Sequence, residues 1–434
     1  MTDHIAFAPA DPVSRAAPPR ATSMDELRDF WPILLACTLG SGCGVIGLVF
    51  YSSTAFMPAL LAEFGWSRSA LALGPTLLSL MVGLCAPMAG RLLDAGHTKA
   101  VLLCSMTMLA MILLALSRMQ GSLWQFWLGY AAMGALGVGT TTIAYTRIIG
   151  ATFDKMRGTA LGIALSGTAL AAAIAPGLVS QISADFGWRS AYLALAGIVA
   201  VLGPLASLPI LISYRPAKVG AGKVDADQVG ISAAQAWRSK VFWKLLLIFP
   251  LIGFSVIGLA VHLVPIMVEG GLTPLQAGRL AGVTGAVMLL SRLGSGVLMD
   301  RFFAPHVGAW TVALAWLALA LLLTGDARLS WGGAAAAGLC VGVEFDLLSY
   351  LALRYFGVRS YGRIAGTAYS FTAIAIAVAA IGYGLLADAL GSYRPGLFIA
   401  LGLLALSLPL MMSLPRFRDS DALPYGSETD RGAR

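Results

Sequence analysis

The sequence predicts an all-α membrane protein of twelve transmembrane helices, arranged as two pseudo-symmetric six-helix bundles. Three observations support this fold class. Of the 434 residues, 58% are hydrophobic and only 12% are charged, about half the ~25% that is usual in soluble proteins. The apolar residues form long runs, and the second half of the chain repeats the pattern of the first. A soluble core cannot hold so many apolar side chains, so the expected solvent is a lipid bilayer.

Twelve apolar runs are long enough to cross a bilayer, which takes roughly 20 residues of helix. Helices are expected rather than barrel strands, because an unbroken apolar run satisfies its own backbone hydrogen bonds in lipid only as a helix. The 50 Gly residues would let these helices approach closely. The runs cover residues 31–56, 70–90, 100–117, 122–146, 158–182, 190–213, 241–267, 274–299, 307–324, 330–353, 364–387 and 394–414.

The distribution of Lys and Arg predicts the orientation, since loops on the cytoplasmic side carry an excess of both. With the N-terminus inside, 22 of the 29 Lys and Arg fall in the tails and in loops on the same side, and 6 fall on the opposite side. Both termini are therefore predicted to face the cytoplasm, and the expected location is the cell inner (plasma) membrane. The net charge of +8 reflects this topology, because no basic run alternates with aromatic residues as in nucleic-acid-binding proteins.

An internal repeat relates residue n to residue n + 206. Without a gap, segment 63–94 aligns with segment 269–300, and the match includes charged positions such as Asp94 and Asp300. Two parallel halves of six helices are typical of transporters that bind their cargo near the midplane, between the halves. The predicted organisation is a cytoplasmic tail (1–30), a first bundle (31–213), a cytoplasmic linker (214–240), a second bundle (241–414) and a cytoplasmic tail (415–434).

The loop at residues 90–99, with Gly90, Asp94 and Lys99 at a characteristic spacing, resembles the loop signature of the major facilitator superfamily. Segment 296–301 resembles it more weakly. This resemblance implies the major facilitator fold and secondary transport by alternating access. Several short segments are also similar, in order and spacing, to the bacterial monocarboxylate transporter and oxalate/formate antiporter branch, namely 63–68, 153–162, 186–189 and 342–362. The branch implies a small organic monocarboxylate as cargo, moved in symport with protons.

Arg292 is the most informative charge, because a charge in the hydrocarbon costs roughly 2.5–3.5 kcal/mol and so marks a functional candidate. It lies about 10 Å inside the eighth predicted span, at 1.5 Å per residue. Its guanidinium is always ionised and matches the shape of a carboxylate. The branch also carries a substrate-binding arginine at this position. Two interpretations stay open: Arg292 binds the substrate, or it forms a structural ion pair with Glu344 or Asp346, and substrate can displace such a partner.

Glu344 and Asp346 are the two acids of the tenth predicted span, and about 200° around the helix separates them. Either can be the proton-coupling site, because a carboxyl group withdrawn from water can exchange a proton near neutral pH. The alternative is a fixed ion pair that holds the helix. Relatives often place a carboxylate one turn before the arginine, where this sequence has Met288. Tyr145 and Tyr350 are candidates to donate a hydrogen bond to the substrate, although tyrosines at a membrane interface often serve only in packing.

Four charged residues lie at predicted cytoplasmic helix ends, in equivalent places of the two halves: Asp94, Arg147, Asp300 and Arg354. The resemblance implies a cytoplasmic gate that is closed when the substrate site faces outward. Exposed ion pairs contribute only about 0–1 kcal/mol each, which suits contacts that must break in every transport cycle. The alternative is that these residues only solvate the loops and set the topology.

Enzyme chemistry is not predicted. The sequence has no nucleophile elbow, no phosphate-binding glycine loop and no His, Asp or Glu cluster with metal-ligand spacing, so no catalytic residue, cofactor or metal is expected. The expected partners are a small organic anion, protons and the lipid bilayer, without nucleic acid, and the resemblance implies a monomer. Two alternatives remain: an exporter or antiporter of another organic solute with a structural Arg292, and a non-transporting sensor on a transporter scaffold.

Overall fold

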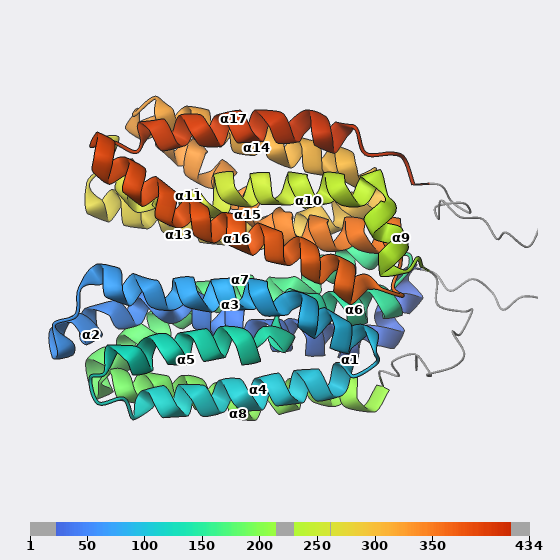
Figure 1. The fold of residues 1–434 in the computed structure, drawn as a ribbon, viewed down its shortest axis with the longest axis horizontal. Coiled ribbons are helices and arrows are strands. Elements are labelled where there is room, and N and C mark those ends of the chain that lie inside the picture. Colours follow the sequence, from blue (N-terminus) through green and yellow to red (C-terminus); the bar gives the residue numbers. More distant parts are fainter. Residues whose placement is uncertain (1–22, 214–229, 261, 418–434) are drawn as a thin grey trace, which may run out of the picture.

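The computed structural model describes residues 23–213, 230–260 and 262–417, which form two layers of helices (Figure 1). The predicted tails and linker therefore lie largely outside the described residues, which omit 1–22, 214–229, 261 and 418–434. Helix α1 begins, and helix α17 ends, at the same end of the molecule, on the right in Figure 1. This end is called the terminal end below, and the opposite end is called the far end.

The layer drawn in blue to green contains the elements before the linker, and it is called the first bundle. Its elements are α1 (Ser23–Gly42), the π-helical turn η1 (Val45–Phe50), the 3₁₀ turn η2 (Ser53–Phe56), α2 (Met57–Phe64), α3 (Arg68–Asp94), α4 (Thr98–Ser117), α5 (Leu123–Leu136), the 3₁₀ turn η3 (Val138–Thr140), α6 (Thr142–Thr152), α7 (Arg157–Phe186) and α8 (Trp188–Ser213).

The second bundle contains the elements after the linker, drawn in yellow-green to red. Its elements are α9 (Ala233–Arg238), α10 (Lys240–Ile252), the π-helical turn η4 (Gly253–Ile257), α11 (Gly258–Ala260), α12 (Leu263–Glu269), α13 (Pro274–Arg301), α14 (Ala304–Leu323), α15 (Ala327–Phe356), α16 (Tyr361–Leu390) and α17 (Arg394–Met412).

The predicted all-α membrane fold is confirmed. Among the described residues, 10 helices are long and apolar enough to cross a membrane. Two of the twelve predicted spans are not among them. The fourth, 122–146, is divided into α5, η3 and α6, so neither helix reaches the required length. The eighth corresponds to the continuous helix α13 of 28 residues.

The repeat is visible in how equivalent helices begin. Ser67 caps α3 by accepting a hydrogen bond from the Ala70 N–H, and Thr273, 206 residues later in the repeat, caps α13 with a capping box. Such side chains satisfy backbone donors that the first helical turn leaves free. Just before each cap, Gly65 and Gly271 have φ values of 65° and 95°, which glycine adopts without strain. Equivalent local sequences therefore produce equivalent turns.

The two bundles meet along two helix pairs, α3 with α16 and α7 with α13. Glycines let the backbones touch at the terminal end. A Cβ atom on Gly90 of α3 would overlap the Gly362 carbonyl oxygen of α16. In the other pair, a Cβ atom on Gly158 would lie 2.5 Å from the Gly296 carbonyl oxygen. No other residue fits either position without separating the helices.

Candidate functional site

Arg292 and Asp346 form a buried ion pair at the interface of the two bundles. The Arg292 Nη1 atom in α13 donates a hydrogen bond to Asp346 Oδ1 in α15 at 3.1 Å. The same nitrogen donates to the backbone carbonyl of Leu165 in α7 of the first bundle, also at 3.1 Å. Arg292 is 3% exposed and Asp346 is fully buried. The guanidinium therefore bonds to both bundles at once.

This ion pair leaves polar atoms unused. Arg292 Nε and Asp346 Oδ2 have no hydrogen-bond partner among the described residues. An arginine offers five N–H donors in a planar fork that fits a carboxylate, and both bonds above use only Nη1. Tyr51, which follows η1 in the first bundle, lies within electrostatic range of both charges. The site therefore retains donors for a second carboxylate beside the internal one.

Glu344 lies outside this pair, although it is only two residues from Asp346 on α15. It is 3% exposed, and neither of its carboxyl oxygens has a hydrogen-bond partner among the described residues. With Phe249 of α10 and Thr311 of α14, it lines a void of about 10 Å³ inside the second bundle. The two predicted proton-coupling candidates therefore have different surroundings: Asp346 faces a cation at the interface, and Glu344 faces the apolar interior.

Four hydroxyl groups link the bundles on the terminal side of the ion pair. Thr142 Oγ1 of α6 donates to Tyr369 Oη of α16 at 2.8 Å. Ser349 Oγ of α15 lies 3.0 Å from the same tyrosine oxygen, and Thr146 Oγ1 of α6 donates to Ser349 at 3.5 Å. All four side chains are buried. Because Ser349 lies one helical turn beyond Asp346, this hydroxyl network adjoins the ion pair.

At the terminal end, Asp94 of the first bundle caps a helix of the second. Its Oδ1 accepts a hydrogen bond from the Gly362 N–H at 2.8 Å, and its Oδ2 accepts one from the Arg363 N–H at 2.9 Å. The free N–H groups at a helix N-terminus carry partial positive charge, which favours a carboxylate there. Arg147, in the same bundle as Asp94, lies with its Nε 3.4 Å from Oδ1. The contact between the bundles is thus a helix cap, and Arg147 pairs with the capping carboxylate from within the first bundle.

Asp300 makes the equivalent cap in the opposite direction. Its Oδ1 accepts from the Gly158 N–H at 2.6 Å, and its Oδ2 accepts from the Thr159 N–H at 2.7 Å and hydroxyl at 2.8 Å. Arg354, the fourth predicted gate residue, is placed differently, with its guanidinium carbon 4.9 Å from the centre of the Phe417 ring. The ion pairs of the described residues do not include Asp300 with Arg354. Three of the four predicted gate residues therefore belong to the terminal closure.

The structure does not bring the two predicted substrate-binding tyrosines to Arg292. Tyr145 is fully buried in the first bundle, and its hydroxyl packs against Gly40 of α1 without a hydrogen-bond partner among the described residues. Tyr350 donates from its hydroxyl to the Met299 carbonyl at 2.9 Å, within the second bundle. In this conformation, both tyrosines pack helices of one bundle together.

Sequence reasoning missed the hydroxyl network and Tyr51. Hydroxyl residues are common in transmembrane helices, so no single one of them is conspicuous. A weak signal was present: Thr142 and Thr146 are four residues apart, and Ser349 is three residues from Asp346, spacings that place each pair on one helix face. Their partner on α16, Tyr369, can be identified only once the bundles are placed together.

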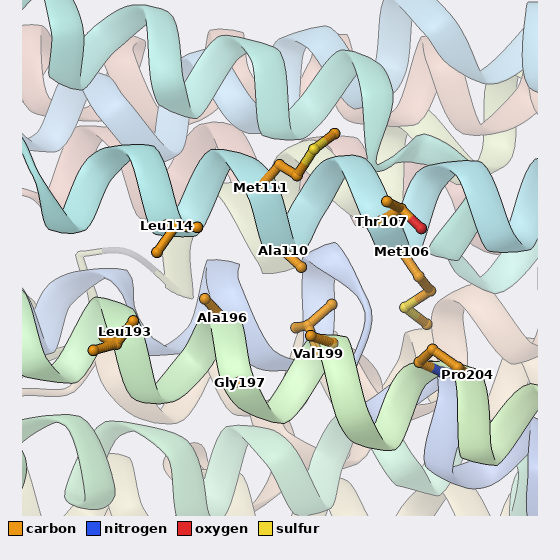
Figure 2. Close-up of a pocket in the computed structure, with 11 residues that line it drawn as sticks. Met106, Thr107, Ala110, Met111, Leu114, Leu193, Ala196, Gly197, Val199 and Pro204 are labelled. Atoms are coloured by element: carbon orange, nitrogen blue, oxygen red, sulfur yellow. The ribbon is translucent and has the colours of Figure 1, made fainter.

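One surface pocket lies away from these residues. It measures about 540 Å³ and lies between α4 and α8, where Figure 2 shows an apolar lining. Two of its lining residues, Met111 and Leu193, are 48% and 54% exposed, so the pocket opens on the outer face of the first bundle. Its lining residues include no charged side chain. This pocket suits apolar chains rather than an anion.

Taken together, the interface is closed toward the terminal end by two helix caps and a hydroxyl network, with a buried arginine and its carboxylate beyond them. Within the described part of the chain, no group of three or more His, Cys, Asp or Glu residues is arranged to hold a metal ion. The arrangement offers a guanidinium with an unused donor, a carboxylate bonded to it, and hydrogen bonds between the two bundles.

Comparisons with known proteins agree with this architecture. A family profile described as Major Facilitator Superfamily matches residues 39–380. A solved structure of the E. coli fucose:proton symporter FucP is similar with a TM-score of 0.66 and 16% identity, over 88% of this chain and 98% of that one. A second FucP structure, in the outward conformation, gives a TM-score of 0.64 and 18% identity over 88% and 98%. The human organic anion transporter TETRAN gives 0.67 and 16% over 89% and 99%. No curated protein sequence matches the chain.

Proposed function

The chain belongs to the major facilitator superfamily and is a membrane transporter, and on this premise we propose that it carries a small organic monocarboxylate together with a proton. Transport would proceed by alternating access, as the bundles over residues 31–213 and 241–414 rock about the site between them. The excess of Lys and Arg on one side supports a cytoplasmic terminal end, so the conformation described here would face outward.

One observation carries the proposal: Arg292 is a buried cation at the interface of the bundles, held by a single carboxylate and with donors to spare. A monocarboxylate that binds the free edge of the guanidinium would place two carboxylates on one cation. Because an uncompensated buried charge is costly, the internal carboxylate of Asp346 would then take up a proton. Binding of one anion would thus bring in one proton and leave the net charge of the site unchanged.

Asp346 is the better of the two candidate acids for this exchange. It is the only one of the two that bonds to Arg292, so substrate binding changes its electrostatic surroundings directly. Glu344 has no contact of this kind among the described residues. The contacts at the terminal end support the alternating-access part of the proposal. The Asp94 and Asp300 caps and the hydroxyl network all link the bundles on the terminal side of the ion pair, so opening that side would require these contacts to break.

The test is uptake of a panel of radiolabelled monocarboxylates, dicarboxylates and neutral sugars into proteoliposomes with an imposed pH gradient. Wild type is compared with Arg292→Ala and, as a matched control, with Arg416→Ala, which removes an exposed arginine. We expect one monocarboxylate to accumulate with the gradient in wild type and control, and not in Arg292→Ala. If no acid moves, or if Arg292→Ala transports as well as wild type, then Arg292 is structural and the protein exports or exchanges another organic solute.

A further inference from the structure

Glu344 is a buried acid that the proposed transport cycle does not use. Its carboxyl group lies inside the second bundle, in a void of about 10 Å³ between α10, α14 and α15. A volume of about 10–15 Å³ accommodates one water molecule, so the void can admit a water or a proton carrier but no organic solute. The carboxyl oxygens have no hydrogen-bond partner among the described residues.

Among the described residues that line the void around Glu344, none is a cation. The lining residues from α10 and α14 are Phe249, Ile252, Gly308, Thr311, Val312 and Ala315, and those from α15 are Cys340, Val343 and Leu347. From the π-helical turn η4, Gly253 packs against the carboxyl group, and Thr372 of α16 lies beside Gly253. Cys340 is the only other titratable group in this set. An ionised carboxylate here would cost several kcal/mol, whereas a protonated carboxyl is neutral and can donate a hydrogen bond.

Gly253, the first residue of the π-helical turn η4, packs against the carboxyl group of Glu344. A Cβ atom on Gly253 would lie 3.1 Å from Glu344 Oε1 and 2.9 Å from the Thr372 methyl carbon, so the carboxyl group packs directly on the π-helical turn. Such turns are rare, mark kinks in helices and concentrate at functional sites. A change of charge at Glu344 would therefore act first on the geometry of η4.

The first bundle also has a π-helical turn with a polar side chain against its first residue, and that side chain is a hydroxyl group that does not titrate. Its π-helical turn η1 begins at Val45, and the Val45 N–H donates to Thr140 Oγ1 of η3 at 2.9 Å. At the offset of 206, Val45 and Thr140 align with Leu251 and Asp346, each two residues from Gly253 and Glu344, so the two pairs occupy neighbouring rather than identical places in the repeat. A neutral hydroxyl thus bonds to the start of one π-helical turn, and a carboxyl group packs against the start of the other.

We infer that Glu344 is a proton-binding switch for the π-helical turn η4, separate from the proton exchanged at the Arg292–Asp346 pair. The neutral acid stays in its apolar void and supports η4, as Thr140 supports η1. Loss of the proton drives the carboxylate out of the void and loosens η4. The ligand of this site is a proton alone, and binding of the proton stabilises the π-helical turn η4, which follows α10.

The experiment is hydrogen–deuterium exchange with peptide mass spectrometry on the full chain in nanodiscs, without any cargo, at a series of pH values and corrected for intrinsic exchange rates. In wild type, we expect exchange over 253–257 to become about tenfold faster above a threshold pH. This factor corresponds to a decrease of ~1.4 kcal/mol in the free energy of opening the turn. Exchange over 45–50 should show no such step, because Thr140 does not titrate. Glu344→Gln should keep the slow exchange over 253–257 at every pH, and Asp388→Asn, which removes an exposed carboxyl, should behave as wild type.

A step that persists in Glu344→Gln, or an equal step at both π-helical turns, would overturn the inference. Should Glu344→Gln fail to fold, Gly253→Ala gives a second test, because its methyl group would press on Glu344 Oε1. We expect this variant to exchange fast over 254–257 at every pH, whereas Gly382→Ala, which has open space around its Cβ position, should behave as wild type. A wild-type step in Gly253→Ala would also overturn it. No cargo is used, so the result stands whatever acid the transport panel identifies.

Discussion

Replacing Asp346 by Asn should separate anion binding from proton coupling. The amide keeps an oxygen that can accept from Arg292 Nη1 at the present 3.1 Å, but it carries no charge and cannot exchange a proton. Arg292 then remains as a buried cation without a carboxylate. A bound monocarboxylate supplies the missing charge, so the variant should still bind and exchange its cargo. It should no longer use a pH gradient to accumulate that cargo.

The magnitudes follow from the burial of the pair. Removing one partner of a buried ion pair costs about 3–5 kcal/mol, and the retained hydrogen bond to Asn puts the expected loss of stability near the lower value. Ligand at about 100 times its Kd stabilises the folded protein by roughly 2.7 kcal/mol, so bound cargo should restore most of the lost stability. In transport, a pH difference of about one unit stores ~1.36 kcal/mol per proton, which supports about tenfold accumulation in wild type and none in the variant.

Two assays on the same proteoliposomes measure these effects. Uptake driven by a pH gradient reports proton coupling, and exchange of labelled for unlabelled acid at equal pH reports binding and movement without net proton transfer. We expect Asp346→Asn to lose the first and keep the second, and Asp388→Asn to keep both. Accumulation at the wild-type level in Asp346→Asn would refute the assignment of the exchanged proton to Asp346. Loss of both activities with a folded protein would instead assign Asp346 to binding.

Two further predictions concern the contacts that hold the molecule in this conformation. Tyr369→Phe removes the hydroxyl that accepts from Thr142 across the bundles, a bond worth about 0.5–1.5 kcal/mol, so single-molecule distance measurements should show the terminal end open several times more often. Hydrogen bonds from Trp188 and Arg189 hold the pKa of Glu63, at the far end, below its ordinary value. Glu63→Gln should therefore lower the Tm slightly at neutral pH, and the difference should shrink as the pH falls below 4.5, the ordinary pKa of this carboxyl group, toward its lowered pKa in the fold.

Each of these predictions has a matched control. Tyr383→Phe removes a hydroxyl from the same helix as Tyr369, and that hydroxyl has no hydrogen-bond partner among the described residues, so it should leave the open fraction unchanged. An equal effect of both substitutions would contradict a role of the Tyr369 hydroxyl in closure. For Glu63, the carboxylate stabilises the fold only while it is ionised, because its pKa is lowered by folding. A Tm difference that stays constant from neutral to acidic pH would contradict that account.

The fold was predictable because insertion into a membrane requires long apolar segments, which are easily recognised in a sequence. Apolar runs of about 20 residues and the repeat at n + 206 depend only on local composition and spacing, and both correspond to elements of the structure. Arg292 was conspicuous for the same reason, since a lone charge in an apolar run stands out. Its partner was not fully predictable: helical spacing shows that Glu344 and Asp346 face different ways, but only the packing of α13 against α15 places Asp346 at the guanidinium.

The gate shows why the remaining contacts could not be predicted. Side-chain charges suggested a gate of ion pairs among Asp94, Arg147, Asp300 and Arg354, yet the two carboxylates of this gate bind across the interface by accepting hydrogen bonds from backbone N–H groups. Every helix has such donors at its N-terminus, so the sequence gives no sign of which helix a distant carboxylate will cap. Tyr369 and Thr142 present the same difficulty, because hydroxyl groups cost little to bury in pairs and carry no charge that would mark them.

The reciprocal caps also constrain how the molecule can open. Asp94 of the first bundle caps α16 of the second, and Asp300 of the second caps α7 of the first. Because both caps lie at the terminal end, a rocking motion that separates the bundles there must break both together. Hydrogen bonds to charged groups contribute about 1.5–3 kcal/mol each, so losing only one cap would leave the closure partly intact. Opening is therefore expected to be cooperative, and neutralising either aspartate alone should favour the open state without uncoupling the two contacts.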